Sequence, residues 1–563
     1  MIPRRPAFAA AILFLALSGC LFLRAVLAQT ISLPNGISIS VSPATRKPTQ
    51  ELQVAPYLSN PPAVIPIDVG RQLFVDDFLI EQTNMWRVGH RPVMYSGNPI
   101  LTPGPRDTAN LAMPYSDGVW FDPTDNLFKM WYDGGPGNAV CYATSTDGRN
   151  WTRPELADPA VPNTNCVATI GGGRDSNTVW LDPLDTNPAR RFKMFALYNV
   201  PQMNIYFSAD GLHWSEPQPN TINSLSDRTT VFYNPFRHVW VESARMKADL
   251  PATDLAPART TRARYYSEST DLVNWTPQDP SSVYWTGPDD RDPPYSPGGP
   301  LPELYNLDAV AYESVMVGMF SWFYPGPSQD NNYADGPNLV ELGVGFSRDG
   351  FSWVRPTRGA GPNAFIPAAN DTESWNAFNT QSVGGAFLVV GDELWFYFSG
   401  RTLKKPASGA GSTGLATLRR DGFYSVDAPA DGGFLTTHPV SFHGNHFFVN
   451  AVGTVAVEVL DAAGNVIPSF SRDNCVAFSG DSTHAEIGWR GADLGSLSGQ
   501  PVRFRFYVPN GSLYSFWVTP SASGASYGYV AAGGPGFTSP IDDGGDPRRN
   551  ASPSVLRHPQ NNR

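Results

Sequence analysis

Three aspartates recur at the same place, just ahead of short β-rich runs of the sequence. Asp117 stands in "YSDGVWF", Asp175 in "GRDSNTVWL" and Asp227 in "LSDRTTVFY". Carboxyl groups that converge from different strands can act as a proton donor and an ionised base, as general acid–base catalysis requires. Asp is also common at turns, so a single position of this kind is as often a strand-entry cap as a functional acid. The recurrence is what favours a functional role.

Two later runs carry polar residues at comparable places. Glu303 and Asp308 lie in "LPELYNLDAVAY", and Glu373 lies in "ESWNAFN", where Asn376 takes the inner position. A further acid, Glu242 in "WVESAR", falls in the middle of a predicted strand. It is either an alternative acid catalyst or half of a buried ion pair with a neighbouring arginine.

A repeated turn motif sets the spacing of these acids. It reads "STDGRNW" at 145–151, "SADGLHW" at 208–214, "STDLVNW" at 269–275 and "SRDGFSW" at 347–353, with a degenerate copy "RRDGFYS" at 419–425. Asp accepts hydrogen bonds from turn amides and Gly permits a positive φ, so we interpret the motif as structural. Its Trp is expected to pack each hairpin onto the next blade. Repeats of this length, built from β-rich runs, predict propeller blades of four strands.

The pattern therefore predicts an all-β protein. We expect a five-bladed β-propeller over residues 67–425, followed by a C-terminal β-sandwich over 426–520, where apolar and polar residues alternate between turns. The content of 52 Gly and 53 Pro fits many turns and few long helices.

The N-terminus has the pattern of an export signal over residues 1–28. A basic start is followed by "AFAAAILFLAL". The segment ends either at a lipobox, "LSGC", which would place a lipid on Cys20 and attach the chain to a membrane, or at an ordinary cleavage site after Ala28. A transmembrane anchor is the weaker interpretation, because Arg24 interrupts the apolar run. We expect an exported protein, either a lipoprotein at the cell surface or in the periplasm, or a secreted one.

The remaining segments outside the predicted domains are polar. Residues 29–66, rich in Pro, Ser, Thr and Asn, are predicted to be a flexible tether, and 521–563 a mostly disordered tail. Cys141 and Cys166 could pair in an oxidising compartment, which would leave Cys475 buried and inert. No spacing of Cys and His suits a metal, and we expect neither a metal nor a cofactor.

The charge of the whole chain limits its partners. The formal net charge is −11, and no run of Lys or Arg is present. Nucleic acid is therefore not an expected partner, and a strongly polyanionic substrate is disfavoured unless a local basic pocket exists.

These features together resemble the five-bladed glycoside hydrolases of families 32, 43, 68, 117 and 130. The resemblance rests on the propeller-plus-sandwich order, the turn motif and "SGNPIL" ahead of the first blade. The 67–520 span is most similar to a group of uncharacterised bacterial secreted proteins that carry "FVDDFLI" and "LRRDGF…GGFLTT". The nucleophile, R-D-P and E-C motifs of family 32 are absent; "MPYSDGVWFDP" and "GRDSN" come nearest to the first two.

The resemblance implies an exported glycoside hydrolase, with an arabinosidase- or fructosidase-like reaction on neutral glycosides or oligosaccharides. Asp117 or Asp227 would be the base or nucleophile and Glu303 the proton donor, while Asp175 would orient the substrate or tune the donor's pKa. A carbohydrate-binding propeller without catalysis is one alternative. A polysaccharide lyase is another, for which the arginines beside Asp175 and Asp227 could neutralise a uronate.

Sugar sites combine aromatic rings with polar groups, because a sugar's C–H face stacks on a ring while its hydroxyls need hydrogen-bond partners. A single aromatic residue of the propeller is more often part of blade packing than of a sugar site. The residues expected to bind substrate are Tyr115, Arg174, Asn177, Arg228, Tyr305, Asp308, Trp322, Trp375 and Asn376.

Overall fold

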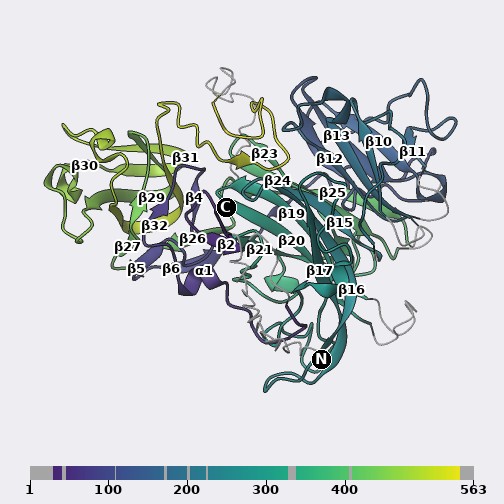
Figure 1. Cartoon of the computed structure of the whole chain (residues 1–563), viewed down its shortest axis with the longest axis horizontal. Coiled ribbons are helices and arrows are strands. Elements are labelled where there is room, and N and C mark those ends of the chain that lie inside the picture. Colours follow the sequence, from purple (N-terminus) through teal and green to yellow (C-terminus); the bar gives the residue numbers. More distant parts are fainter. Residues whose placement is uncertain are drawn as a thin grey trace, which may run out of the picture.

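The chain forms a β-propeller with a second β-rich lobe beside it (Figure 1). The blades lie at the centre and right of Figure 1, and the lobe that contains β29 to β32 lies at the left. The computed structural model describes residues 30–40, 46–107, 110–169, 174–198, 203–223, 226–326, 338–404 and 409–544.

Five sheets form the blades, each built mainly from strands that are consecutive in the sequence, which confirms the predicted all-β, five-bladed fold. Blade one contains β8 (Val119–Asp122), β9 (Leu127–Asp133), β10 (Val140–Ser145) and β11 (Cys166–Ala168). Blade two contains β12 (Arg174–Leu181), β13 (Phe192–Tyr198) and β14 (Met203–Ser208). Blade three contains β15 (Thr230–Asn234), β16 (Val239–Leu250), β17 (Arg259–Ser269) and β18 (Tyr284–Thr286). Blade four contains β19 (Glu303–Glu313), β20 (Val315–Tyr324) and β21 (Leu339–Ser347).

Blade five closes the ring with a strand from the other end of the domain. It contains β22 (Thr380–Gln381), β23 (Leu388–Val390), β24 (Glu393–Arg401) and β25 (Gly411–Arg419). Its outer edge is β7 (Val93–Met94), which pairs with β25 in antiparallel register. Because a segment that precedes blade one completes blade five, the first and last blades are held together by backbone hydrogen bonds.

The repeated motif is a hydrogen-bonded turn, as predicted. The Ser145 hydroxyl donates to Asp147 Oδ1 at 2.9 Å, and the Gly148 amide donates to Ser145 Oγ at 2.8 Å. The amides of Arg149 and Asn150 donate to the same carboxylate oxygen at 2.9 and 2.8 Å. The same pattern recurs at Ser208 and Asp210, Ser269 and Asp271, and Ser347 and Asp349.

Each turn contacts the preceding blade, rather than the next one as the sequence suggested. The Tyr397 hydroxyl of blade five donates to the Gly148 carbonyl of blade one at 2.8 Å. Trp131 of blade one donates to Gly211 in the turn of blade two, also at 2.8 Å. The direction follows from geometry, because the turn leaves the outer part of its own blade and folds back on its neighbour.

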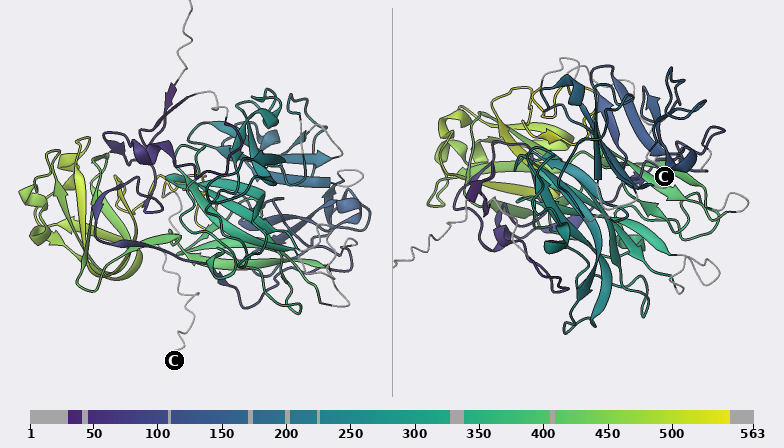
Figure 2. Two further views of the ribbon diagram at one scale, coloured as in Figure 1. Left: turned by 90° about the horizontal axis from the view of Figure 1, so that it is seen from below. Right: turned by 45° about the vertical axis from the view of Figure 1, so that its right-hand side comes forward.

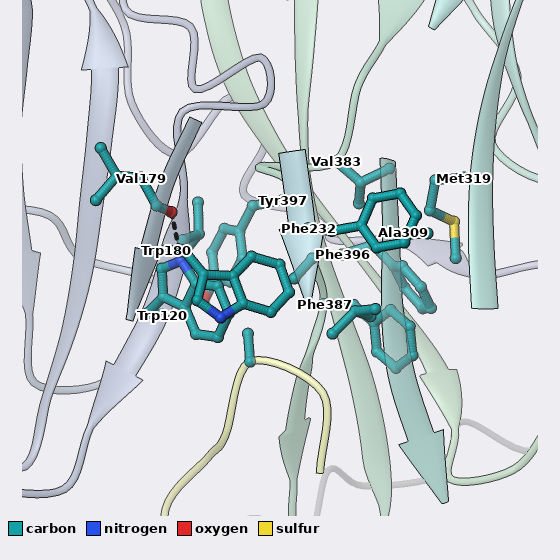
Figure 3. Close-up of a cluster of buried hydrophobic side chains, with 14 of the residues drawn as sticks. Trp120, Val179, Trp180, Phe232, Ala309, Met319, Val383, Phe387, Phe396 and Tyr397 are labelled. Carbon is teal, nitrogen blue, oxygen red and sulfur yellow. Dashed lines mark hydrogen bonds between the residues drawn. The ribbon is translucent and has the colours of Figure 1, made fainter. Parts of the chain in front are cut away.

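The propeller core takes side chains from all five blades, among them Trp120 of β8, Trp180 of β12, Phe232 of β15, Ala309 of β19 and Phe396 of β24 (Figure 3). Trp120 of blade one and Trp180 of blade two meet edge to face, with ring centroids 4.7 Å apart. The Trp120 indole also donates to the Val179 carbonyl at 2.9 Å, which joins two adjacent inner strands. Such aromatic pairs contribute beyond the area that they bury. The inner strands are thereby fixed relative to one another, and the residues at their entrances with them.

The second lobe is one hydrogen-bonded, nine-stranded sheet around its own apolar core. Its two longest strands are β29 (His446–Leu460) and β32 (Arg503–Thr519), and register shifts interrupt their pairing. Besides these strands the sheet contains β26 (Tyr424–Asp427), β27 (Gly433–Thr437), β30 (Cys475–Val476), β31 (Phe478–Trp489), β4 (Gln72–Leu73), β5 (Ile80–Thr83) and β6 (Trp86–Gly89). The lobe therefore includes strands before residue 90, which the sequence analysis assigned to the propeller.

The chain segments on either side of the two lobes also pack against them, which differs from the expected tether and tail. Residues 46–66 contribute Tyr57 and Ile65 to the core of the second lobe, and α1 (Pro56–Ser59) and β3 (Ile65–Pro66) lie in this stretch. At the other end, β33 (Tyr529–Val530) pairs with β19 of blade four. Residues 545–563 lie outside the described part of the chain. The polar, Pro-rich composition of residues 29–66 favoured a flexible tether in the prediction. In the structure, a few buried apolar side chains such as Tyr57 and Ile65 hold part of this segment against the second lobe.

A buried charge network joins the propeller to the second lobe. Arg71 contacts Asp421 at 3.0 Å, and Arg420 contacts Glu313 at 3.1 Å and Asp542 at 3.2 Å. Asp421 is the aspartate of the degenerate fifth motif copy. Burial opposes its ionisation, but the neighbouring Arg71 and Arg420 guanidinium groups lower the pKa of Asp421. Figure 2 shows the two lobes side by side in a second orientation.

Two smaller expectations concern the cysteines and the membrane. Cys141 and Cys166 form a disulfide between β10 and β11 of blade one, and Cys475 is free and buried. In the described ranges no helix is long and apolar enough to cross a membrane. The export signal, including Cys20, lies outside those ranges.

Candidate functional site

A polar cavity of about 160 Å³ opens where the inner strands of blades one, two and three begin. It brings together Tyr115, Asp117, Asn177, Asp227 and Arg228, all of which the sequence analysis singled out. The full lining is Leu111, Tyr115, Ser116, Asp117, Asp133, Ser176, Asn177, Asp227, Arg228 and Arg401.

Asp227 is the most accessible carboxylate of the cavity, with a side chain that is 32% exposed. The Tyr305 hydroxyl of blade four donates to its Oδ2 at 2.8 Å. Arg228 Nε lies 3.5 Å from Oδ1, and Arg245 Nη2 lies 3.9 Å from Oδ2. Arg245 also donates from Nε to the Asp227 carbonyl at 2.8 Å, so both backbone and side chain are positioned. These donors fix the orientation of the Asp227 carboxylate in the cavity.

Asp117 faces the same cavity from blade one and is 1% exposed. Its amide donates to the Pro114 carbonyl at 2.6 Å, and its carbonyl accepts from the Val179 amide of blade two at 2.8 Å. The turn that carries Asp117 is therefore tied to the next blade. The chain enters blade one through Gly118, which has φ +115, so a side chain there would be strained.

Tyr115 links the two arginines of the cavity. The Arg228 guanidinium lies over its ring at 3.9 Å from the centroid, and Arg401 donates to its hydroxyl. Arg228 has φ +62, in the left-handed region, and Arg264 Nη2 donates to its carbonyl at 2.9 Å. Burial works against the charge of Arg228, but Tyr305, Tyr115 and Asp227 together raise its pKa, so it stays a cation.

Below the cavity, a hydrogen-bonded group joins three blades at the axis. Asn306 Nδ2 lies 3.1 Å from Ser116 Oγ, 2.9 Å from Asp308 Oδ2 and 3.0 Å from Ser382 Oγ. Asp308 is 2% exposed and does not line the cavity. Burial raises the pKa of Asp308 to about 6, against the opposing effect of hydrogen bonds from Ser116 and Asn306. Asp308 is thus part of the floor that supports Ser116, rather than a group that meets substrate directly.

Glu303 is placed differently from the expectation. It begins β19 and forms an ion pair with Arg262 of blade three. It is not among the residues that line the cavity. Its carboxylate therefore lies on the rim, because β19 begins several residues before the level of the floor residue Asp308.

Three other residues that were predicted to bind substrate do not line this cavity. Trp322, on the second strand of blade four, lines a separate cavity beside Arg355, whose guanidinium lies 4.7 Å from the indole. Trp375 packs against Phe398 with ring centroids 5.5 Å apart. Asn376 donates to Thr380 Oγ1 at 3.2 Å. These are packing and loop contacts.

Blade two contributes the remaining predicted residues. Arg174 and Asp175 begin β12, and their side chains lie outside the described part of the structure. Asn177 is buried in the cavity wall, and among the described residues neither its Oδ1 nor its Nδ2 has a hydrogen-bond partner. A buried amide without partners is costly, and a bound hydroxyl would satisfy both of its atoms.

Two charged residues of the cavity were missed from the sequence. Asp133 is the last residue of β9 and Arg401 the last of β24, and both strands are the second of their blades. The sequence-based prediction concerned only residues that stand just ahead of inner strands. In an antiparallel blade the second strand ends where the inner strand begins, so a polar residue at the end of "LFKMWYD" or "LWFYFSGR" was the available signal.

Glu242 is a buried acid behind the cavity. It lies on β16, opposite Val231 and Ser267, and is fully buried, with no hydrogen-bond partner on either oxygen among the described residues. Burial raises the pKa of Glu242 well above its ordinary value. It does not form the ion pair with Arg245 that the sequence offered as an alternative, since Arg245 points to Asp227.

No group of three or more His, Cys, Asp or Glu side chains is arranged to hold a metal within the described ranges.

Comparison with known proteins gives no family. No protein-family model and no curated protein matches the chain. Among solved structures, a glycosyl hydrolase from Bacteroides ovatus is similar at 12% identity and a TM-score of 0.36, covering 62% of this chain and 97% of its own. A structure from family 130 of mannoside phosphorylases, which contains glycoside hydrolases that target β-1,2-mannosidic linkages in Candida mannan, gives 13% identity, a TM-score of 0.37, and coverage of 62% and 96%.

A family 32 glycoside hydrolase from Bifidobacterium adolescentis covers more of this chain, 83% against 85% of its own, at 10% identity and a TM-score of 0.32. At these identities the chemistry has to be inferred from the site itself.

Proposed function

We propose that the chain is an exported glycoside hydrolase that cleaves an O-glycosidic bond in the cavity at the propeller axis. The observation that carries this proposal is that Asp117 of blade one and Asp227 of blade three line one cavity. Hydrolysis of a glycoside needs one carboxyl group that gives a proton to the leaving oxygen and one carboxylate that attacks the sugar or activates water. Export rests on the pattern of residues 1–28.

The surroundings of the two carboxyl groups support different roles. Asp227 receives the Tyr305 hydroxyl and lies beside Arg228, so it fits the carboxylate that acts as nucleophile or base. Asp117, which lines the same cavity and is more deeply buried, is assigned the proton transfer. Glu303, at the rim with Arg262, is assigned no direct role.

A polysaccharide lyase is the second candidate, and the arginines of the cavity favour it. A lyase needs a cation that neutralises a uronate and a base that removes the neighbouring proton. Arg228 could be that cation, and the Asp227 carboxylate beside it that base. The two reactions differ in product, because elimination leaves a carbon–carbon double bond and hydrolysis consumes water.

The test is a screen of glycosides and oligosaccharides with the full chain and its Asp117→Asn and Asp227→Asn variants. New reducing ends without ultraviolet absorbance would support hydrolysis, and an unsaturated, absorbing product would support the lyase. Binding without cleavage by the wild type would favour a carbohydrate-binding propeller and contradict the enzyme proposal.

A further inference from the structure

The cavity contains two arginines beside its three aspartates, so it offers cationic donors that the net charge of the whole chain does not reveal. Arg228 and Arg401 both line it and both contact Tyr115, one on the ring face and one at the hydroxyl. The formal net charge of −11 suggested a neutral ligand. Local cations in a concave site outweigh distant charge, because exposed charges beyond about 10 Å are largely screened by salt.

Neither guanidinium is fully used by the protein. Arg228 Nε lies 3.5 Å from Asp227, longer than the roughly 2.7–2.9 Å of a charge-assisted hydrogen bond. Arg401 has the Tyr115 hydroxyl as a partner, and in the described ranges it forms no ion pair with a carboxylate. Arginine carries five N–H donors in a planar fork that matches a carboxylate. Donor capacity therefore remains on both side chains.

We propose that Arg228 and Arg401 bind the carboxylate of an acidic sugar, which makes the substrate of this site a uronic-acid-containing saccharide. The proposal rests on the proposed function, in that it takes the cavity as the sugar site. A singly charged carboxylate fits better than a doubly charged phosphate, because Asp117, Asp133 and Asp227 line the same cavity and repel added negative charge.

Other arginines nearby show why these two are selected. Arg262 pairs with Glu303 on the rim and does not line the cavity. Arg245 is directed to the backbone and carboxylate of Asp227. Arg262 is therefore a matched control, as an arginine of the same mouth whose charge is already neutralised.

The experiment is isothermal titration of the full chain with pairs of probes that differ only in charge. Trigalacturonate and triglucuronate are compared with their methyl esters, and inorganic phosphate is added as a competitor. We expect at least one acid to bind about tenfold or more tightly than its ester, since hydrogen bonds to charged groups are the strong ones, and to weaken with salt. Arg228→Gln and Arg401→Gln should abolish this preference, and Arg262→Gln should keep it.

Arg401→Lys guards against loss of folding. It keeps the charge but not the fork, so the preference should shrink without vanishing while the melting temperature stays near that of the wild type. Equal affinity for acid and ester, a preference that persists in both Gln variants, displacement of the acid by equimolar phosphate, or no binding of any probe would each overturn the proposal.

The same titrations separate this proposal from the proposed function. An ester that binds as well as the acid and is cleaved with dependence on Asp227 would refute the acidic substrate and leave the hydrolase standing. If the acid binds through Arg228 and Arg401 but the protein cleaves no glycoside, the acidic ligand is supported and the hydrolase proposal is refuted.

Discussion

The Tyr305 hydroxyl of blade four donates a 2.8 Å hydrogen bond to the Asp227 carboxylate of blade three. The bond crosses from one blade to the next at the mouth of the cavity, so the position of Asp227 depends on how the two blades are packed. Arg228 lies between the rings of Tyr115 and Tyr305, at 3.9 and 5.7 Å from their centroids. The Asp227 carboxylate and its neighbour Arg228 thus contact residues of blades one and four.

Tyr305→Phe should lower kcat on a responsive glycoside by about tenfold, because it removes one hydrogen bond to a charged group and leaves the ring in place. Steady-state kinetics with the wild type and the variant checks this. Unchanged kcat in a folded Tyr305→Phe protein would show that the bond does not support the reaction.

The raised pKa of Asp308 predicts how stability depends on pH. Its folded-state pKa of about 6 lies above the unfolded value of about 3.9, so folding favours the protonated carboxyl. The associated stability is present below about pH 4 and is lost as the pH rises to about 6, with a difference of about 3 kcal/mol in the free energy of unfolding. Asp308→Asn should flatten this part of the curve. Urea unfolding between about pH 4 and 7 measures it, and identical pH dependence in both proteins would contradict the assignment.

The buried charge network predicts that the two lobes behave as one unit. Arg420→Met leaves Glu313 and Asp542 without their cation and should cost about 3–5 kcal/mol, whereas Arg419→Met, which removes an exposed pair with Asp481, should cost about 1 kcal/mol or less. Limited proteolysis of the wild type should give one large fragment. An early cut near 426–432 in the wild type would show that the lobes separate readily.

The turn motif should matter for stability and not for chemistry. Partial burial opposes ionisation of Asp147, but the amide donors of its turn lower its pKa to about 2. Its contribution to stability is therefore present above about pH 4 and is lost as the pH falls toward 2. Asp147→Asn should lower the free energy of unfolding by about 1 kcal/mol at neutral pH and leave kcat unchanged. A large loss of kcat in the folded variant would contradict a purely structural motif.

The repeats allowed the blades to be predicted because they are local signals. Ser145 and Asp147 act on amides within the same turn, so their role is visible in seven consecutive residues. The cavity depends on residues brought together by the closure of the ring. Asp117 and Asp227 could be found because both stand just before inner strands. Asp133 and Arg401 stand at the ends of second strands, where the sequence analysis predicted no site residues.

Glu303 and Trp322 were predicted to belong to the site, but neither lines the cavity. Both lie on blade four, near strand ends and close in sequence to the floor residues, yet Glu303 is engaged by Arg262 and Trp322 faces another cavity. Which side of a blade a residue occupies depends on one step of strand register, and β19 contains a register shift between Leu304 and Asn306. A shift of this kind leaves no mark in the sequence.

The most direct test of the account is the rate of glycosidic bond cleavage by Asp117→Asn, Asp227→Asn and Glu303→Gln, each checked for folding by its melting temperature. Both Asp variants should lose about 10²–10⁴-fold in kcat/KM, and Glu303→Gln should stay within about tenfold of the wild type. Wild-type rates from folded Asp117→Asn and Asp227→Asn proteins would contradict the central claim that these two carboxyl groups, facing one cavity, carry the reaction.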